Sequence, residues 1–364
     1  MASAINNGTF TFNPEELKDW NEVIFELTYG DPALNSVHDV QQGIKHQEQI
    51  VFAGRIGPVG KKVQADCTPN AISGVTLTEK LWNPAFEDLR LEHCSSDVNQ
   101  QDKLVNQMTR MNPDYWTVVD GSQSAIGNFL VERVLSAMGE NIWFKVWFDD
   151  KDASEFGSGS GSENFTVGAD LDYWNSFDGI WKQIYQETEL ASGGKYYSDA
   201  LASRNSQATY ALQELVPGEA IDAMKSVYNK ADSRLRSRPD ARYLVTRSVY
   251  DAVINDLETI QNVGGFTQTN ENGIMTLRYR GVPVTMMDTW DRFIDDYKNS
   301  GTNRFLPHRI ALTVSSNIPI GTLAEGDFGT LDAFYDRYNK VNVIDGVYSL
   351  DSKLLEDYLT CVAY

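Results

Sequence analysis

The segment from Arg242 to Val314 constrains the fold of this 364-residue chain most, because strand-like and helix-like patterns alternate in it over short distances. Residues 242–246 and 309–314 are rich in β-branched and apolar side chains, which favours strands. Between them, apolar side chains repeat at helical spacing from Ser248 to Ile260, and the Ser248 hydroxyl can cap the first turn. Such a helix must cover a sheet, so the segment predicts a mixed α/β fold.

The same segment predicts a β-hairpin between that helix and the last strand. Residues 273–279 are mostly β-formers, Arg280 and Gly281 supply a turn, and Val282–Met287 returns as a second strand. Pro283 has no N–H to donate to a neighbouring strand, so we expect its strand to lie at a sheet edge or to begin there.

Length, charge and cysteine content narrow the class of protein. The chain is long enough to bury a large core, as two domains or as one elaborate domain. Its formal net charge of -20 and its lack of clustered Lys and Arg argue against a protein that grips nucleic acid. We expect neither a signal peptide nor a membrane-spanning helix, because no apolar run is long enough. The cysteines lack metal-ligand spacing and predict reduced thiols at Cys67, Cys94 and Cys361.

Residues 1–45 predict an arm that carries one helix. Asn13 and Pro14 are typical of a helix start, and an apolar stripe follows at Leu17, Trp20 and Ile24. A polar segment joins this helix loosely to the rest of the chain, so we expect the stripe to dock on a neighbouring surface, of the same subunit or of another. An ordinary first helix of the core fits the same pattern.

Residues 46–93 predict a β-rich excursion. Gln49–Phe52 and Lys62–Ala65 have the form of two strands around a glycine-rich tip near Pro58. Two further strands, at Val75–Thr78 and Leu89–Glu92, are expected near the base of this excursion. A routine hairpin within a sheet is the plainer interpretation of the same residues.

The rest of the chain predicts a series of alternating elements. A long helix is expected to end at Gly139, and residues 142–148, the most β-prone run of the chain, predict a central strand. The glycine- and serine-rich residues 156–163 predict a mobile loop, not a phosphate loop, because no Lys-Ser/Thr pair follows the glycines. Further helices are expected at 177–185, from Pro217 onward and at 331–338, and a last strand is expected at 359–364.

No set of residues predicts a catalytic, cofactor or metal site. The four histidines are scattered and none has ligand spacing to another histidine or a cysteine. In a chain with 51 acidic residues, paired acids are expected on solvated faces, as at Asp149 with Asp150 and Asp291 with Asp295 and Asp296. An enzymatic alternative would rest on two carboxylates near aromatic side chains, as in a glycosidase, which residue spacing cannot reveal.

Three stretches, in their order and spacing, resemble the major capsid proteins of tailed bacteriophages with the HK-97 fold. They are YLVTRSVYDAV at 243–253, GIMTLRYRGVPVTMMD at 273–288 and PHRIALTVSSNIPIGT at 307–322. The resemblance implies a mixed α+β subunit. Its implied parts are an N-terminal arm at 1–45, an extended β-hairpin E-loop at 46–93, a peripheral domain with a long spine helix and a long strand at 94–164, an axial domain at 165–345, and a return to the peripheral domain at 346–364.

The same resemblance implies a structural, non-enzymatic function without a cofactor. Subunits of this kind self-assemble into pentamers and hexamers of an icosahedral virion shell, which encloses double-stranded DNA without sequence-specific binding. The implied partners are scaffolding, portal and decoration proteins, no membrane is involved, and assembly is implied in the host cytoplasm. The subunit contacts that we expect lie at Leu17, Trp20, Ile24 and Pro58.

Two alternatives to the phage capsid stay open at this point. An encapsulin-like nanocompartment shell protein shares the fold and holds an enzyme cargo in place of a genome. A soluble acidic hydrolase, such as a carbohydrate-active enzyme, belongs to another class and predicts a monomer or small oligomer with a cleft.

Overall fold

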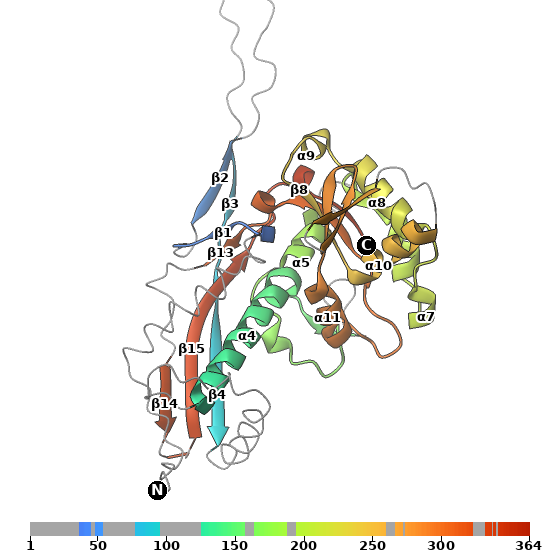
Figure 1. Ribbon diagram of the computed structural model, residues 1–364. Helices are drawn as coiled ribbons and strands as arrows, with labels where there is room; N and C mark the ends of the chain where they lie inside the picture. The colour runs from blue at the N-terminus through green and yellow to red at the C-terminus, as the bar shows by residue number, and fades with distance from the viewer. Residues whose placement is uncertain are drawn as a thin grey trace, which may run out of the picture.

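A computed structural model describes residues 36–44, 48–53, 77–94, 125–156, 164–187, 194–259, 266–271, 274–322, 332–336, 338–339 and 341–364. Figure 1 shows a compact part built on one sheet and, beside it, a long β-ribbon, with the helix α4 running between them. The predicted contacts Leu17, Trp20, Ile24 and Pro58 fall outside the described residues, so the predictions for the arm and the hairpin tip stay untested.

A seven-stranded mixed sheet forms the centre of the compact part. Its strand order is β7 (Tyr197–Ser198), β16 (Cys361–Ala363), β12 (Ile310–Val314), β8 (Ala241–Val245), β11 (Val282–Met286), β10 (Ile274–Tyr279) and β9 (Phe266–Glu271). β8 pairs antiparallel with β12, where Val245 lies opposite Ile310, and parallel with β11. The strands predicted at 242–246 and 309–314, and a last strand held in a sheet, are therefore confirmed.

The predicted hairpin is formed by β10 and β11. Arg280 and Gly281 both have positive φ, 49° and 85°, and such a turn matches the right-handed twist of the flanking strands. Of the two predicted alternatives for Pro283, the edge position is wrong, because β11 lies between β8 and β10, and a strand that begins there is confirmed. Pro283 is tolerated because its strand begins at Val282, and the pairing with β8 starts only at Val284.

Two amphipathic helices contribute apolar side chains to the same core as this sheet. α10 (Arg247–Thr259) begins one residue before the predicted Ser248 and buries Val249 and Val253 completely. α8 (Glu219–Lys230) begins after Gly218 and buries its apolar stripe of Ala220, Ala223, Met224 and Val227. The short helices α6 (Ala202–Asn205), α7 (Tyr210–Gln213) and α9 (Ser233–Arg236) lie in the adjoining connections.

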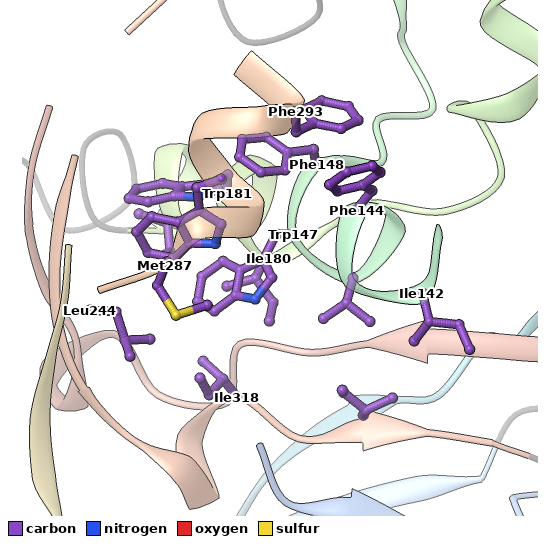
Figure 2. Close-up of a cluster of buried hydrophobic side chains, with 14 of the residues drawn as sticks. Ile142, Phe144, Trp147, Phe148, Ile180, Trp181, Leu244, Met287, Phe293 and Ile318 are labelled. Carbon is purple, nitrogen blue, oxygen red and sulfur yellow. The ribbon is translucent and has the colours of Figure 1, made fainter. Parts of the chain in front are cut away.

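The strand predicted at 142–148 is wrong, because these residues form the last two turns of α4 (Ala125–Phe148). Apolar side chains of this run are buried in one cluster with residues of α5 (Ile180–Ile184) and α11 (Asp288–Tyr297) (Figure 2). Phe148 stacks on Phe293 with 4.4 Å between ring centroids, and Trp147 meets Trp290 edge-on at 4.6 Å. Burial on every side of this end of the helix outweighs the β-propensity of its residues.

The β-ribbon is a second sheet, built around the long strand β15 (Val341–Ser352). β15 pairs antiparallel with β4 (Ala85–Cys94) over ten residue pairs, with β14 (Asp332–Asp336), and with β13 (Ile320–Gly321), which in turn pairs with β1 (Val40–Gln41). The short helix predicted at 331–338 is therefore wrong. Backbone pairing with residues 341–345, which a local pattern cannot include, makes this segment a strand.

A two-stranded hairpin continues the line of the ribbon in Figure 1. β2 (Gln49–Ala53) pairs with β3 (Leu77–Leu81), so the strand predicted at Gln49–Phe52 is confirmed. Its proposed partner at Lys62–Ala65 lies outside the described residues. A further short pair, β5 (Ser154–Glu155) with β6 (Asn164–Phe165), adjoins the end of α4. No helix in the described part of the chain has the length and hydropathy to cross a membrane.

Candidate functional site

The ribbon and its hairpin each carry large apolar side chains in contact with solvent. Val51, Leu81, Phe86 and Val347 are exposed by 57, 50, 66 and 42%. Val51 lies opposite Glu79 and Leu81 opposite Gln49, so both side chains project from one face of the hairpin. Phe86 lies opposite Ser349 and Val347 opposite Asp88, which places these two side chains on one face of the ribbon. We call these four residues the ribbon patch.

The inward face of the ribbon is apolar and covered. Leu89 and Leu91 of β4, with Tyr348 and Leu350 of β15, belong to the core that surrounds the end of α4. On β4, the residues that alternate with Leu89 and Leu91 are exposed: Asp88, Arg90 and Glu92. The strand therefore has the alternating pattern of a half-buried strand. Phe86 and Val347 thus lie on the opposite face, which is only partly exposed, since Val343 and Ser349 on that face are buried.

A buried ionic cluster fastens the ribbon to α4. The Lys145 ammonium of α4 lies 2.6 Å from the Glu87 carboxylate of β4, and the two side chains are exposed by only 2 and 12%. One turn later, Asp149 accepts a hydrogen bond from the Phe177 N–H at 3.0 Å, just before α5. Next to it, Asp150 pairs with Lys182 of α5 at 2.9 Å.

This cluster corrects the expectation that Asp149 and Asp150 lie on a solvated face, since both are buried. Burial raises the pKa of Asp149 to about 7, opposed by the nearby Lys145 ammonium. The sequence held no signal of this cluster, because its partners come from β4 and α5, elements separated from Asp149 along the chain.

His38 fixes the first described segment against the end of α4. The Trp147 N–H donates to His38 Nε2 at 3.1 Å, so His38 Nδ1 carries the proton and donates to the Ile318 carbonyl at 2.9 Å. Burial lowers the pKa of His38 to about 4, which keeps the ring neutral at physiological pH. Residues 36–44 are also held by β1, which pairs parallel with β13 and places Val40 opposite Ile320. His38 and β1 therefore attach residues 36–44 to α4 and to the ribbon sheet.

One cavity of about 380 Å³ lies between α10 and the connection from α7 to α8. Its lining includes Ser248 and His308, whose hydroxyl and Nδ1 are 2.7 Å apart. His308 Nε2 lies 2.6 Å from the Gln213 carbonyl, so Nε2 donates and Nδ1 accepts from the serine. Both ring nitrogens are engaged by the protein and burial lowers the pKa of His308, which fits a neutral histidine that ties the loop before β12 to α10.

Two of the other paired acids, Asp291 and Asp295, also have partners within the fold. Asp291 accepts a hydrogen bond from the Arg247 N–H at 2.7 Å, and burial raises its pKa to about 6. Asp295 pairs with Arg304 on the surface. Within the described ranges, no group of three His, Cys, Asp or Glu residues is arranged to hold a metal ion.

Comparison with known proteins gives matches among solved structures. No protein-family model and no curated protein sequence matches the chain. A chain of the satellite phage P4 procapsid including size determination (Sid) protein matches with a TM-score of 0.51 at 8% identity, over 94% of this chain and 97% of that chain. The capsid of the native GTA particle gives 0.48 at 9% identity, over 100% and 93%. The holo-SrpI encapsulin complex from Synechococcus elongatus gives 0.45 at 9% identity, over 91% and 86%.

The match to the P4 procapsid is nearly end to end in both chains, and it identifies the fold. This chain has the mixed α/β fold of a phage capsid structure. The resemblance noted in the three stretches of sequence is thus confirmed at the level of the fold, although only 8% of residues are identical.

Proposed function

We propose that this chain is the major capsid protein of a tailed-bacteriophage-like virion. Its subunits would form pentamers and hexamers that tile an icosahedral shell around double-stranded DNA. The observation that carries this proposal is the nearly end-to-end fold match to a phage procapsid chain. The ribbon patch, on an element that lies beside the compact part, supports it independently.

The physical case for assembly starts from the ribbon patch. A neighbouring subunit that covers the exposed apolar side chains of the ribbon patch gains free energy, at roughly 25 cal/mol per Å² of apolar surface. Contacts between different faces of identical subunits, repeated around an axis, close into rings. An elongated subunit with patches far from its centre can take part in several such contacts at once.

We assign the parts of the fold by analogy with the resembled family. α4 with β4 and β15 would be the spine helix and the long strands of the peripheral domain, and the hairpin of β2 and β3 the base of the E-loop. The seven-stranded sheet would be the axial domain. The ranges 1–45, 46–93, 94–164, 165–345 and 346–364 remain our proposed division. Leu17, Trp20, Ile24 and Pro58 remain proposed contacts.

The proposed role requires neither catalysis nor tight binding of the genome. A net charge of -20 suits a shell that encloses DNA without binding its phosphates. Scaffolding, portal and decoration proteins are the proposed partners, and the proposed location is the virion, after assembly in the host cytoplasm.

The mass of the native particle tests this proposal. Light scattering after gel filtration, with negative-stain images of the same fraction, should detect closed shells or capsomers of five and six chains. DNA inside the shells would support the virion, whereas an enzyme cargo would identify a nanocompartment. A chain that stays monomeric at high concentration and with crowding agents would contradict the shell and favour the hydrolase alternative.

A pair of surface variants sharpens the test. Phe86→Ser removes the most exposed member of the ribbon patch, and Val167→Ser removes a side chain of equal exposure, 66%, from a turn outside the ribbon. Both variants should fold, since neither side chain is buried. Only Phe86→Ser is expected to weaken assembly; equal assembly of the two variants would remove the ribbon patch from the proposed contacts.

A further inference from the structure

The cluster of Glu87, Lys145 and Asp149 lies where β4 of the ribbon meets the end of α4. Two carboxylates face one ammonium there, so the fully ionised cluster holds one excess negative charge. Glu87 Oε1 and Asp149 Oδ1 are both buried and have no hydrogen-bond partner within the described residues. A buried excess charge is costly, the more so where carboxylate oxygens lack donors, and a proton on Asp149 would remove that charge.

The groups around Asp149 come from each element that packs on it. α4 supplies Lys145, β4 supplies Glu87, and the segment before α5 supplies the N–H groups of Ser176 and Phe177. The backbone is fixed too, since the Gly179 N–H donates to the Asp149 carbonyl at 2.8 Å. The side chain therefore cannot reach solvent without movement of β4 or of the segment before α5.

We propose that this cluster is a proton-operated joint between the ribbon and α4. A proton on Asp149 neutralises the excess negative charge and leaves the Lys145 ammonium to pair with Glu87 alone, which holds β4 against α4. Loss of that proton restores the buried charge and loosens the attachment of the ribbon. The inference concerns the single subunit, so it stands or fails independently of the proposed shell.

The direction of the effect follows from the pKa of Asp149. Burial raises it from 3.8 to about 7, so the folded joint binds its proton more tightly than the unfolded chain does. The resulting stabilisation is complete below pH 3.8 and is lost as pH rises through about 7. Between about pH 6 and pH 8, one proton of this kind changes the opening equilibrium by about tenfold.

Hydrogen exchange on the unassembled subunit measures this opening. Protection of amides in β4 and β15 would be followed at about pH 6, 7 and 8 in the wild type and in Asp149→Asn, which is permanently neutral. Comparing the two proteins at each pH removes the intrinsic pH dependence of exchange. The ratio of wild-type to variant opening should rise about tenfold in β4. In β12 of the seven-stranded sheet it should stay constant.

Asp150→Asn is the matched control, because Asp150 is equally buried but pairs with Lys182. Asp149 is intact in this control, so its β4 opening should follow pH as in the wild type, and the ratio of wild-type to Asp150→Asn opening should stay constant. The proposal would be refuted if the ratio of wild-type to Asp149→Asn opening in β4 stayed constant with pH, or if it rose equally in β12. If Asp149→Asn does not fold, Glu87→Gln serves instead: burial is the main cause of the raised pKa of Asp149, but the Glu87 charge adds to it, so the loosening should begin at lower pH when that charge is removed. An unmoved midpoint in Glu87→Gln would equally refute the proposal.

Discussion

Replacing Gly179 by alanine tests the packing between α4 and α5. The backbone of Gly179 has φ -65° and ψ 168°, which any residue can adopt, so only space demands a glycine here. A Cβ would lie 2.8 Å from Asp149 N, 2.9 Å from the Trp147 carbonyl carbon and 3.0 Å from Asp149 O. These are backbone atoms of a buried helix end, which cannot move aside as a flexible side chain would.

Gly179→Ala is therefore expected to destabilise the folded chain by about 1–3 kcal/mol, as overpacking of a tight core does. The control is Gly139→Ala in the middle of α4, where a Cβ would meet no atom within 4 Å. There alanine should stabilise by about 0.5–1 kcal/mol, because it lowers the entropy of the unfolded chain and favours helix.

Urea unfolding of the two variants as unassembled subunits measures the difference. The opposite signs make the comparison robust, since any general effect of a glycine-to-alanine change is shared. Equal stability of Gly179→Ala and wild type would refute the packing argument. It would mean that the segment before α5 can move away from α4 at no cost.

Three further outcomes are expected. Lys145→Met should destabilise by about 3–5 kcal/mol in urea, because it leaves Glu87 buried without a counter-charge, and adding Glu87→Leu should recover most of that loss. Since the pKa of His38 is lowered from 6.5 to about 4, its contribution to stability is complete above pH 6.5 and lost as pH falls toward 4; His38→Gln should lack that part of the stability–pH curve. Burial raises the pKa of Cys361 to about 12, so iodoacetamide at about pH 8 should label it only after unfolding, and rapid labelling of native protein, seen by mass spectrometry, would contradict this.

The strands and helix between Arg242 and Val314 were predictable because each is specified by its own residues. The helical pattern agrees with the burial of Val249 and Val253 in α10, and the β-branched and apolar composition of 242–246 and 309–314 agrees with the largely buried strands β8 and β12. The strand prediction at 142–148 was wrong because β-branched and aromatic residues occur both in buried strands and at a helix end that is buried on every side. The sequence does not distinguish these two cases. The helix predicted at 331–338 was wrong for a related reason, since the strand found there depends on a partner strand supplied by residues 341–345.

The ionic cluster and the Ser248–His308 contact could not have been predicted from spacing. Glu87 and Lys145 lie 58 positions apart, and Ser248 and His308 lie 60 apart. Each pair is created only when separate elements pack, so no local window contains it. The predicted contacts in the arm and at the hairpin tip rest on sequence pattern alone.

The pairing of β4 with β15 has a consequence for how the protein is made. A ribosome produces residues 85–94 long before residues 341–350, yet these segments form the ten-residue pairing of β4 with β15. In the interval, nascent β4 carries unpaired backbone groups together with Phe86, Leu89 and Leu91, a combination prone to aggregation. Closing so large a loop is slow, so the yield of native protein should depend on chaperones that shield β4 and on the pace of translation.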